Sequence, residues 1–140
     1  MKNLILIFTI LYLCITPQTV YSKEKESPYK NNIVPFEEAI NLNKPIILAI
    51  IKEQDKNSLE RISQIYKTLN KGYKNEFNFT ILKYSNFEYN LWVRKFSPTC
   101  YPSLYIVNPT DYSYIYIPEN FYSKNELKKF INAYKKGTLR

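Results

Sequence analysis

An unbroken apolar run at residues 46–51 (IILAII) is the strongest feature of the hydrophobic pattern in this 140-residue chain. Six consecutive apolar residues, most of them β-branched, are typical of a strand that is buried on both faces and lies inside a parallel or mixed sheet. Alternating or short apolar stretches predict three further strands, at residues 77–82, 104–107 and 112–117. The turn sequence NPTD at 108–111 makes the last two strands an antiparallel hairpin.

Apolar residues at intervals of three and four predict four helices. The first is a short helix of about two turns that begins at Pro35, and the last begins at Ser123. Of the two between them, one runs from Asn57 to about Tyr73 and the other begins at Ser85. The starts at Asn57, Ser85 and Ser123 have the form of capping boxes, in which Glu follows the capping residue three positions later. This order of elements predicts an α/β domain with a mixed central sheet of about four strands flanked by helices.

The N-terminal segment, residues 1–22, has the pattern of a secretory signal peptide. Lys2 supplies the positive start, residues 4–15 supply the apolar segment, and the small-residue cleavage site ends at Ser22. The apolar segment is shorter than the roughly 20 residues that a membrane-spanning helix needs. We therefore expect cleavage and no transmembrane span in the mature chain. A retained N-terminal anchor and a lipid attached at Cys14 are the alternatives.

The mature protein is expected outside the cytosol, in the periplasm, the secretory lumen or the exterior, where the environment is oxidising. Its first residues, 23–33, are polar and are expected to form a flexible lead-in. Residues 34–140 then form one domain of ordinary size.

The composition limits the classes of chemistry. The chain has a formal charge of +8, supplied almost entirely by lysine, and it contains no histidine. Without histidine, His-based metal sites and a Cys–His catalytic pair are excluded, and we expect neither a metal nor a cofactor. Basic charge mixed with tyrosine can indicate single-stranded nucleic acid binding. Lys, Asn, Ile and Tyr are all abundant, however, as AT-rich coding would make them, so we expect no specific nucleic acid partner.

Two segments carry a resemblance to a known family. Lys44-Pro45 separates a short helix from the strand at 46–51, and Cys100-Tyr101-Pro102-Ser103 separates a helix from a strand that ends in Asn108-Pro109. Both resemble the thioredoxin-like superfamily, in particular exported thioredoxin-family domains, over about residues 34–136. The first segment is similar to the entry into the central strand of that fold. The second is similar to its cis-proline segment, so the resemblance implies a thioredoxin-like fold with a cis bond before Pro102.

The chain departs from that family at the redox motif. Oxidoreductases of the family carry Trp-Cys-x-x-Cys where the central strand gives way to the next helix, because a helix N-terminus stabilises a thiolate. Here the corresponding segment, 52–58, reads KEQDKNS, and Ala49 stands where such proteins often have an acid. Without two thiols no intramolecular disulfide can cycle. Dithiol oxidoreductase activity is therefore excluded, and we expect no catalytic residue.

The resemblance implies a groove that holds an extended peptide, with the residue before the cis-proline pairing its backbone with the peptide. The expected function is non-catalytic binding or scaffolding of a polypeptide partner. The alternative is a single-thiol protein that forms mixed disulfides through Cys100, which otherwise is a buried, idle thiol. Trp92 is expected to be a core residue. The expected groove residues are Tyr101, Pro102, Lys52, Gln54, Asp55 and Asn57.

Overall fold

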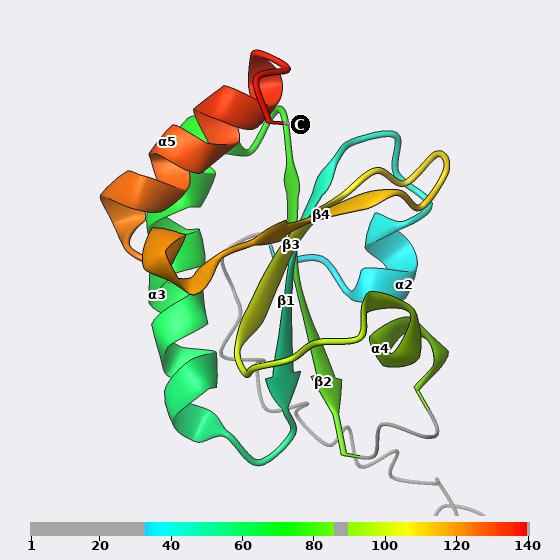
Figure 1. Ribbon diagram of the computed structural model, residues 1–140. Coiled ribbons are helices and arrows are strands. Elements are labelled where there is room, and N and C mark those ends of the chain that lie inside the picture. The colour runs from blue at the N-terminus through cyan, green and yellow to red at the C-terminus, as the bar shows by residue number, and fades with distance from the viewer. Residues whose placement is uncertain (1–32, 86–89, 140) are drawn as a thin grey trace, which may run out of the picture.

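The computed structural model describes residues 33–85 and 90–139 (Figure 1). The expected signal peptide, the lead-in up to residue 32 and residues 86–88 of the capping box that begins at Ser85 lie outside this described part. The elements in chain order are α2 (Phe36–Ala39), β1 (Ile46–Lys52), α3 (Lys56–Tyr73), β2 (Asn78–Tyr84), α4 (Leu91–Phe96), β3 (Ser103–Val107), β4 (Tyr114–Ile117), the 3-10 turn η2 (Glu119–Phe121) and α5 (Lys124–Lys135).

The four strands form one mixed sheet in the order β2-β1-β3-β4. Strand β1 pairs in parallel with β2 and antiparallel with β3, so it is an internal strand, as its apolar run predicts. Strands β3 and β4 form the expected antiparallel hairpin, with Val107 opposite Tyr114. The predicted fold class, a mixed sheet of four strands flanked by helices, is confirmed.

Helices cover both faces of the sheet, α3 and α5 on one and α2 and α4 on the other (Figure 1). Alternate residues of β1 therefore enter two separate cores. Ile47 and Ala49 pack with apolar side chains of α3 and α5. Ile46, Leu48 and Ile50 pack with those of α2 and α4. This two-sided burial explains why the strand has no polar position before Lys52.

Tyr66 ties α3 to the sheet. Its side chain is fully buried, and its hydroxyl lies 3.0 Å from the carbonyl oxygen of Ile47 and 3.2 Å from that of Thr80, to which it donates. These carbonyls belong to β1 and β2, so one hydroxyl holds the helix over the junction of two strands. Burial raises the pKa of Tyr66 well above its ordinary value, so the hydroxyl keeps its proton and its role as donor.

Several element boundaries differ from the sequence-based expectation. Helix α2 has four residues, not about two turns. Helix α4 begins at Leu91, and Asn90, not Ser85, is its N-cap: the Asn90 side chain accepts a hydrogen bond from the Val93 N–H. Ile33, the last residue of the expected lead-in, forms a parallel bridge to Phe79.

One further boundary differs at a chain turn. Strand β4 begins at Tyr114, because the turn continues through Tyr112, which has a positive φ of 56°, to Ser113. Helix α3 ends at Tyr73, as expected. Within residues 33–85 and 90–139, no helix has the length and apolar character needed to cross a membrane.

The role of Tyr66 can be tested by removing its hydroxyl. We expect Tyr66→Phe to lower the free energy of unfolding by about 1–2 kcal/mol, because buried acceptors lose a donor while the ring still fills its place. Urea denaturation followed by circular dichroism measures the change. Tyr112→Phe is the matched control, since Tyr112 is 37% exposed, and it should change stability by less than about 0.5 kcal/mol. Equal effects of the two variants would contradict the proposed role.

Candidate functional site

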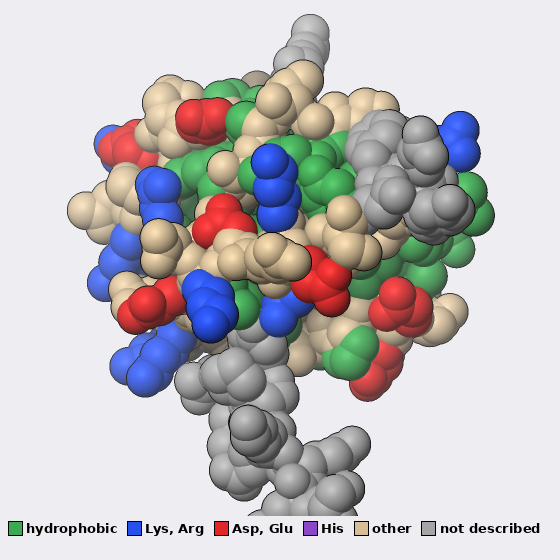
Figure 2. Space-filling model, turned by 90° about the horizontal axis from the view of Figure 1, so that it is seen from below, with side chains coloured by type: hydrophobic (Ala, Val, Ile, Leu, Met, Phe, Trp, Pro, Cys, Tyr) green, Lys and Arg blue, Asp and Glu red, His purple; other side chains and the backbone are tan. Residues whose placement is uncertain are grey.

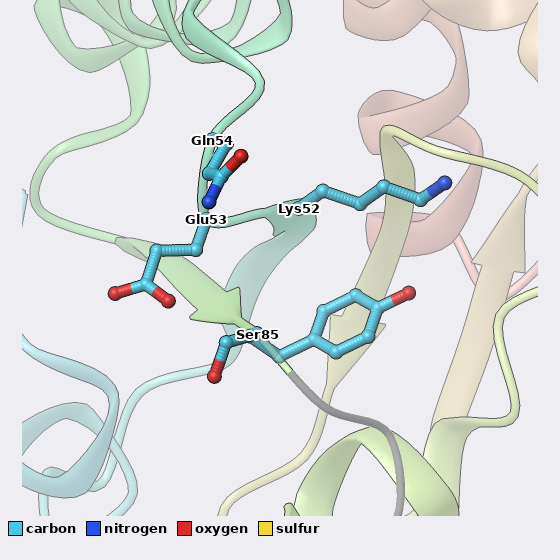
Figure 3. A pocket seen from close by; sticks show the side chains of 5 residues that line it. Lys52, Glu53, Gln54 and Ser85 are labelled. Carbon is cyan, nitrogen blue, oxygen red and sulfur yellow. The ribbon is translucent and has the colours of Figure 1, made fainter.

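The candidate site lies at the carboxyl ends of β1 and β2. Because these two strands are parallel, their ends meet at one edge of the sheet. A pocket of about 390 Å³ opens there, and Figure 3 shows the Lys52 side chain extending to one side of the strand ends while Glu53 points to the other. The residues that line the pocket are Lys52, Glu53, Gln54, Tyr84 and Ser85.

Tyr101 borders this pocket from the segment that precedes β3. Its ring centroid lies 5.0 Å from that of Tyr84, and the Lys52 ammonium lies 5.3 Å from the centre of the Tyr101 ring. Burial raises the pKa of Tyr101 above its ordinary value, and the neighbouring Tyr84 hydroxyl adds to the effect. Two tyrosine rings from different segments thus lie against each other, and the Lys52 ammonium lies over one of them.

The backbone of Tyr101 is unpaired. In the described part of the chain, no group donates a hydrogen bond to its carbonyl or accepts one from its N–H. The residues on either side are constrained. The peptide bond from Tyr101 to Pro102 is cis, the geometry expected above, and the Cys100 carbonyl accepts a hydrogen bond from the Ser103 hydroxyl. Ser103 then enters the sheet opposite Ile50. A half-buried, unpaired backbone unit next to a sheet can accept an extended polypeptide by strand addition.

Cys100 lies beside this backbone unit and is half-buried. Its Sγ is 3.4 Å from the Tyr116 hydroxyl and 3.7 Å from the Ser103 hydroxyl. The hydrogen bond with Cys100 raises the pKa of Tyr116. Within the described residues, the polar contacts of the thiol are hydroxyl groups and the Pro102 carbonyl, and none of them is a cation of the kind that surrounds reactive cysteines.

The start of α3, where the redox motif would stand, is occupied by a carboxylate. Asp55 is the N-cap of the helix, and it accepts hydrogen bonds from the Ser58 N–H at 2.9 Å and the Ser58 hydroxyl at 2.6 Å. These hydrogen bonds lower the pKa of Asp55 from its ordinary value of 3.8. The capping box expected at Asn57 is therefore wrong, because Asp55 offers a carboxylate two residues earlier. Asn57 lies inside the helix and is exposed.

The structure brings together part of the expected groove. Lys52 and Gln54 line the pocket, and Tyr101 contacts Lys52. Asp55 is turned into its own helix, and neither Asn57 nor Pro102 is among the residues that line the pocket. Sequence reasoning missed Tyr84, Glu53 and Ser85. The parallel pairing of β1 with β2 could have indicated Tyr84, since it places Tyr84, the last residue of β2, opposite Lys52, the last residue of β1.

No cluster of three or more metal-ligating side chains occurs within the described residues, 33–85 and 90–139. Trp92 is partly buried and packs against the core formed with α2 and α4. The centroid of its ring lies 5.0 Å from that of Phe36.

Comparisons with known proteins agree on the fold. The sequence model of a family described as a thioredoxin-like domain matches residues 20–133. Among solved structures, the chain resembles human ERp44 in its zinc-bound form, with 19% identity and a TM-score of 0.59 over 76% of this chain and 32% of that one. It also resembles the J-Trx1 fragment of ERdj5, with 14% identity and a TM-score of 0.55 over 71% of this chain and 45% of that one.

A third similar structure is a thioredoxin from Thermus thermophilus, with 12% identity and a TM-score of 0.53 over 70% of this chain and 82% of that one. The chain spans less than half the length of the ERp44 and ERdj5 chains that it matches. At these identities the likeness shows the fold alone. No curated protein matches the chain.

The cap of α3 gives a test with a built-in control. We expect Asp55→Ala to lower the urea midpoint of unfolding at neutral pH, because the first turn loses its acceptor. Since the folded-state pKa of Asp55 is lowered, its stabilisation is present above the unfolded pKa, 3.8, and is lost as pH falls through the folded pKa. The difference between the wild type and Asp55→Ala should therefore shrink in acid. Asn57→Ala should leave the midpoint unchanged or slightly higher, because Ala suits a helix interior. A larger decrease of the urea midpoint for Asn57→Ala than for Asp55→Ala would show that Asn57, not Asp55, caps the helix.

Proposed function

Because the chain belongs to the thioredoxin-like domain family and carries no Cys-x-x-Cys motif, we propose that it is a polypeptide-binding module without dithiol redox activity. The sequence has two cysteines, Cys14 and Cys100, and they lie far apart along the chain. The helix start that would hold a reactive thiol carries Asp55, which is satisfied by its own helix. The fold is retained, but the two neighbouring thiols that dithiol redox chemistry requires are absent from the sequence.

The observation that carries the proposal is the unpaired backbone of Tyr101. An extended peptide laid along this unit gains main-chain hydrogen bonds, which give affinity without a sequence requirement. The adjoining pocket then selects among side chains. Lys52 favours an acidic or polar group, and the paired rings of Tyr84 and Tyr101 favour an apolar or aromatic one.

We further propose that the protein acts after export. The support is the signal-peptide pattern of residues 1–22. Intact-mass measurement of the protein recovered from outside the cytosol should give a chain that begins at Lys23. A mass that includes Met1 would contradict cleavage.

Peptide display tests the binding proposal. Peptides of random sequence selected on the purified protein are expected to lose at least about tenfold in affinity against Tyr101→Asp, because a charge replaces the aromatic ring that lies against Tyr84 and Lys52 beside the pocket. Tyr112→Asp is the matched control: it makes the same change at an exposed tyrosine with a positive φ, a conformation that Asp tolerates. Equal affinity for Tyr101→Asp and the wild type, or an equal loss in both variants, would contradict binding at this groove.

The alternative of mixed-disulfide formation through Cys100 has a specific observation in its favour, since the thiol adjoins the unpaired Tyr101 backbone and is half-buried, not sealed. Cys100→Ser separates the two functions. Non-covalent binding predicts that the selected peptides bind Cys100→Ser as they bind the wild type. A mixed-disulfide function predicts that capture requires Cys100 and that a reductant releases the captured partner.

A further inference from the structure

The positive charge of the protein is concentrated on one of its two helical layers. The described residues include 15 Lys and Arg and nine Asp and Glu. Residues 55–76 and 124–136, which form α3, α5 and their ends, hold ten of the basic residues and four of the acidic ones. The rest of the described chain holds five of each and has no net charge. We call the ten residues the basic layer: Lys56, Arg61, Lys67, Lys71, Lys74, Lys124, Lys128, Lys129, Lys135 and Lys136.

Little of this charge is neutralised within the fold. Lys129 pairs with Glu126 at 2.6 Å, and Lys135 pairs with Glu76 at 2.5 Å. The carboxylate of Asp55 is engaged in capping α3. Within residues 33–85 and 90–139, the other eight members of the basic layer form no ion pair. All of the ten are exposed except Lys128, which is half-buried.

The two helices present these side chains side by side. The Tyr73 hydroxyl lies 3.0 Å from the Asn132 Oδ1, and the Lys135 ammonium lies 5.9 Å from the centre of the Tyr73 ring, so the C-terminal halves of α3 and α5 are in contact. Figure 1 shows both helices on the same side of the sheet. In Figure 2 most of the basic side chains in view lie on the left, the side on which α3 and α5 lie in Figure 1.

We propose that the basic layer holds the protein against the surface of an anionic phospholipid membrane. Nine of its ten residues are lysines, whose hydrated point charges suit a diffuse anionic surface better than the bidentate recognition of single phosphates that arginine provides. Lysines near such a surface each add to the attraction, so a broad layer of them binds although each contact is weak.

The contact is electrostatic and does not insert into the bilayer. The exposed large apolar side chains of the described residues are Leu42, Leu91, Tyr112, Tyr114 and Tyr116. All five lie outside α3 and α5. The basic layer therefore lacks the apolar anchors of an inserting helix and the exposed aromatic rings that stack on single-stranded nucleic acid.

Sedimentation with lipid vesicles tests the proposal on the purified chain. The chain is expected to sediment with vesicles in which roughly one third of the phosphatidylcholine is replaced by phosphatidylglycerol, and to stay in solution with phosphatidylcholine alone. Binding should fall about tenfold or more when the salt concentration rises from about 0.05 M to 0.5 M, because salt screens exposed charges. Equal binding to neutral vesicles, or binding that resists salt, would overturn the proposal.

Two charge-reversal variants assign the binding to the basic layer. K67E/K71E and K44E/R94E change the net charge by the same amount, but only the first pair lies on the basic layer. We expect K67E/K71E to weaken vesicle binding about tenfold and K44E/R94E less than about twofold. Urea denaturation checks that both variants are folded. Equal losses of vesicle binding in the two variants would show that only the net charge matters. Tighter binding of the wild type to RNA or to polyglutamate than to the vesicles would indicate that another polyanion, not the membrane, is the partner. Either result would overturn the proposal.

Discussion

The burial of β1 on both faces is the constraint on which the rest of the structure depends. Residues 46–51 have almost no exposed surface, so each side of the strand must be covered by its own layer of helices. Tyr66 locks one of these layers to the backbone of β1 and β2. Where the apolar run ends, at Lys52, the chain leaves the core. The candidate site lies at that point, because the ends of the two parallel strands meet there.

In this fold, the N-terminus of α3, just after the end of β1, can carry different functional groups. A helix that starts there favours a negative group at its N-terminus, whether a thiolate or a carboxylate. In this chain the position belongs to Asp55, whose carboxylate accepts hydrogen bonds from the Ser58 N–H and the Ser58 hydroxyl. The helix is thereby capped by a side chain of the chain's own adjoining segment. Among the described residues, the Tyr101 backbone near this helix start has no hydrogen-bond partner.

The parts of the fold that depend on residue patterns were predictable from the sequence. The apolar run at 46–51, the turn at 108–111 and the cap at Ser123 all form as expected, since each is decided by neighbouring residues. The α3 cap was misplaced because Asp55 and Asn57 both suit an N-cap, and only the fold decides between them. Tyr84 was missed because its place opposite Lys52 follows from strand pairing, not from local sequence.

The distribution of lysine and tyrosine is a separate matter from their abundance. A compositional bias alone would scatter both residue types over the whole surface, but the net charge of the described domain lies on the layer of α3 and α5. The three tyrosines named among the exposed large side chains, Tyr112, Tyr114 and Tyr116, lie in or next to β4, at the edge of the sheet. Long helices can carry charge along a whole solvated side, whereas the short helices α2 and α4 leave part of the opposite face uncovered. The layer of α3 and α5 is therefore basic, and the other side of the sheet carries exposed tyrosines. A membrane held against the basic layer leaves the Tyr101 site free.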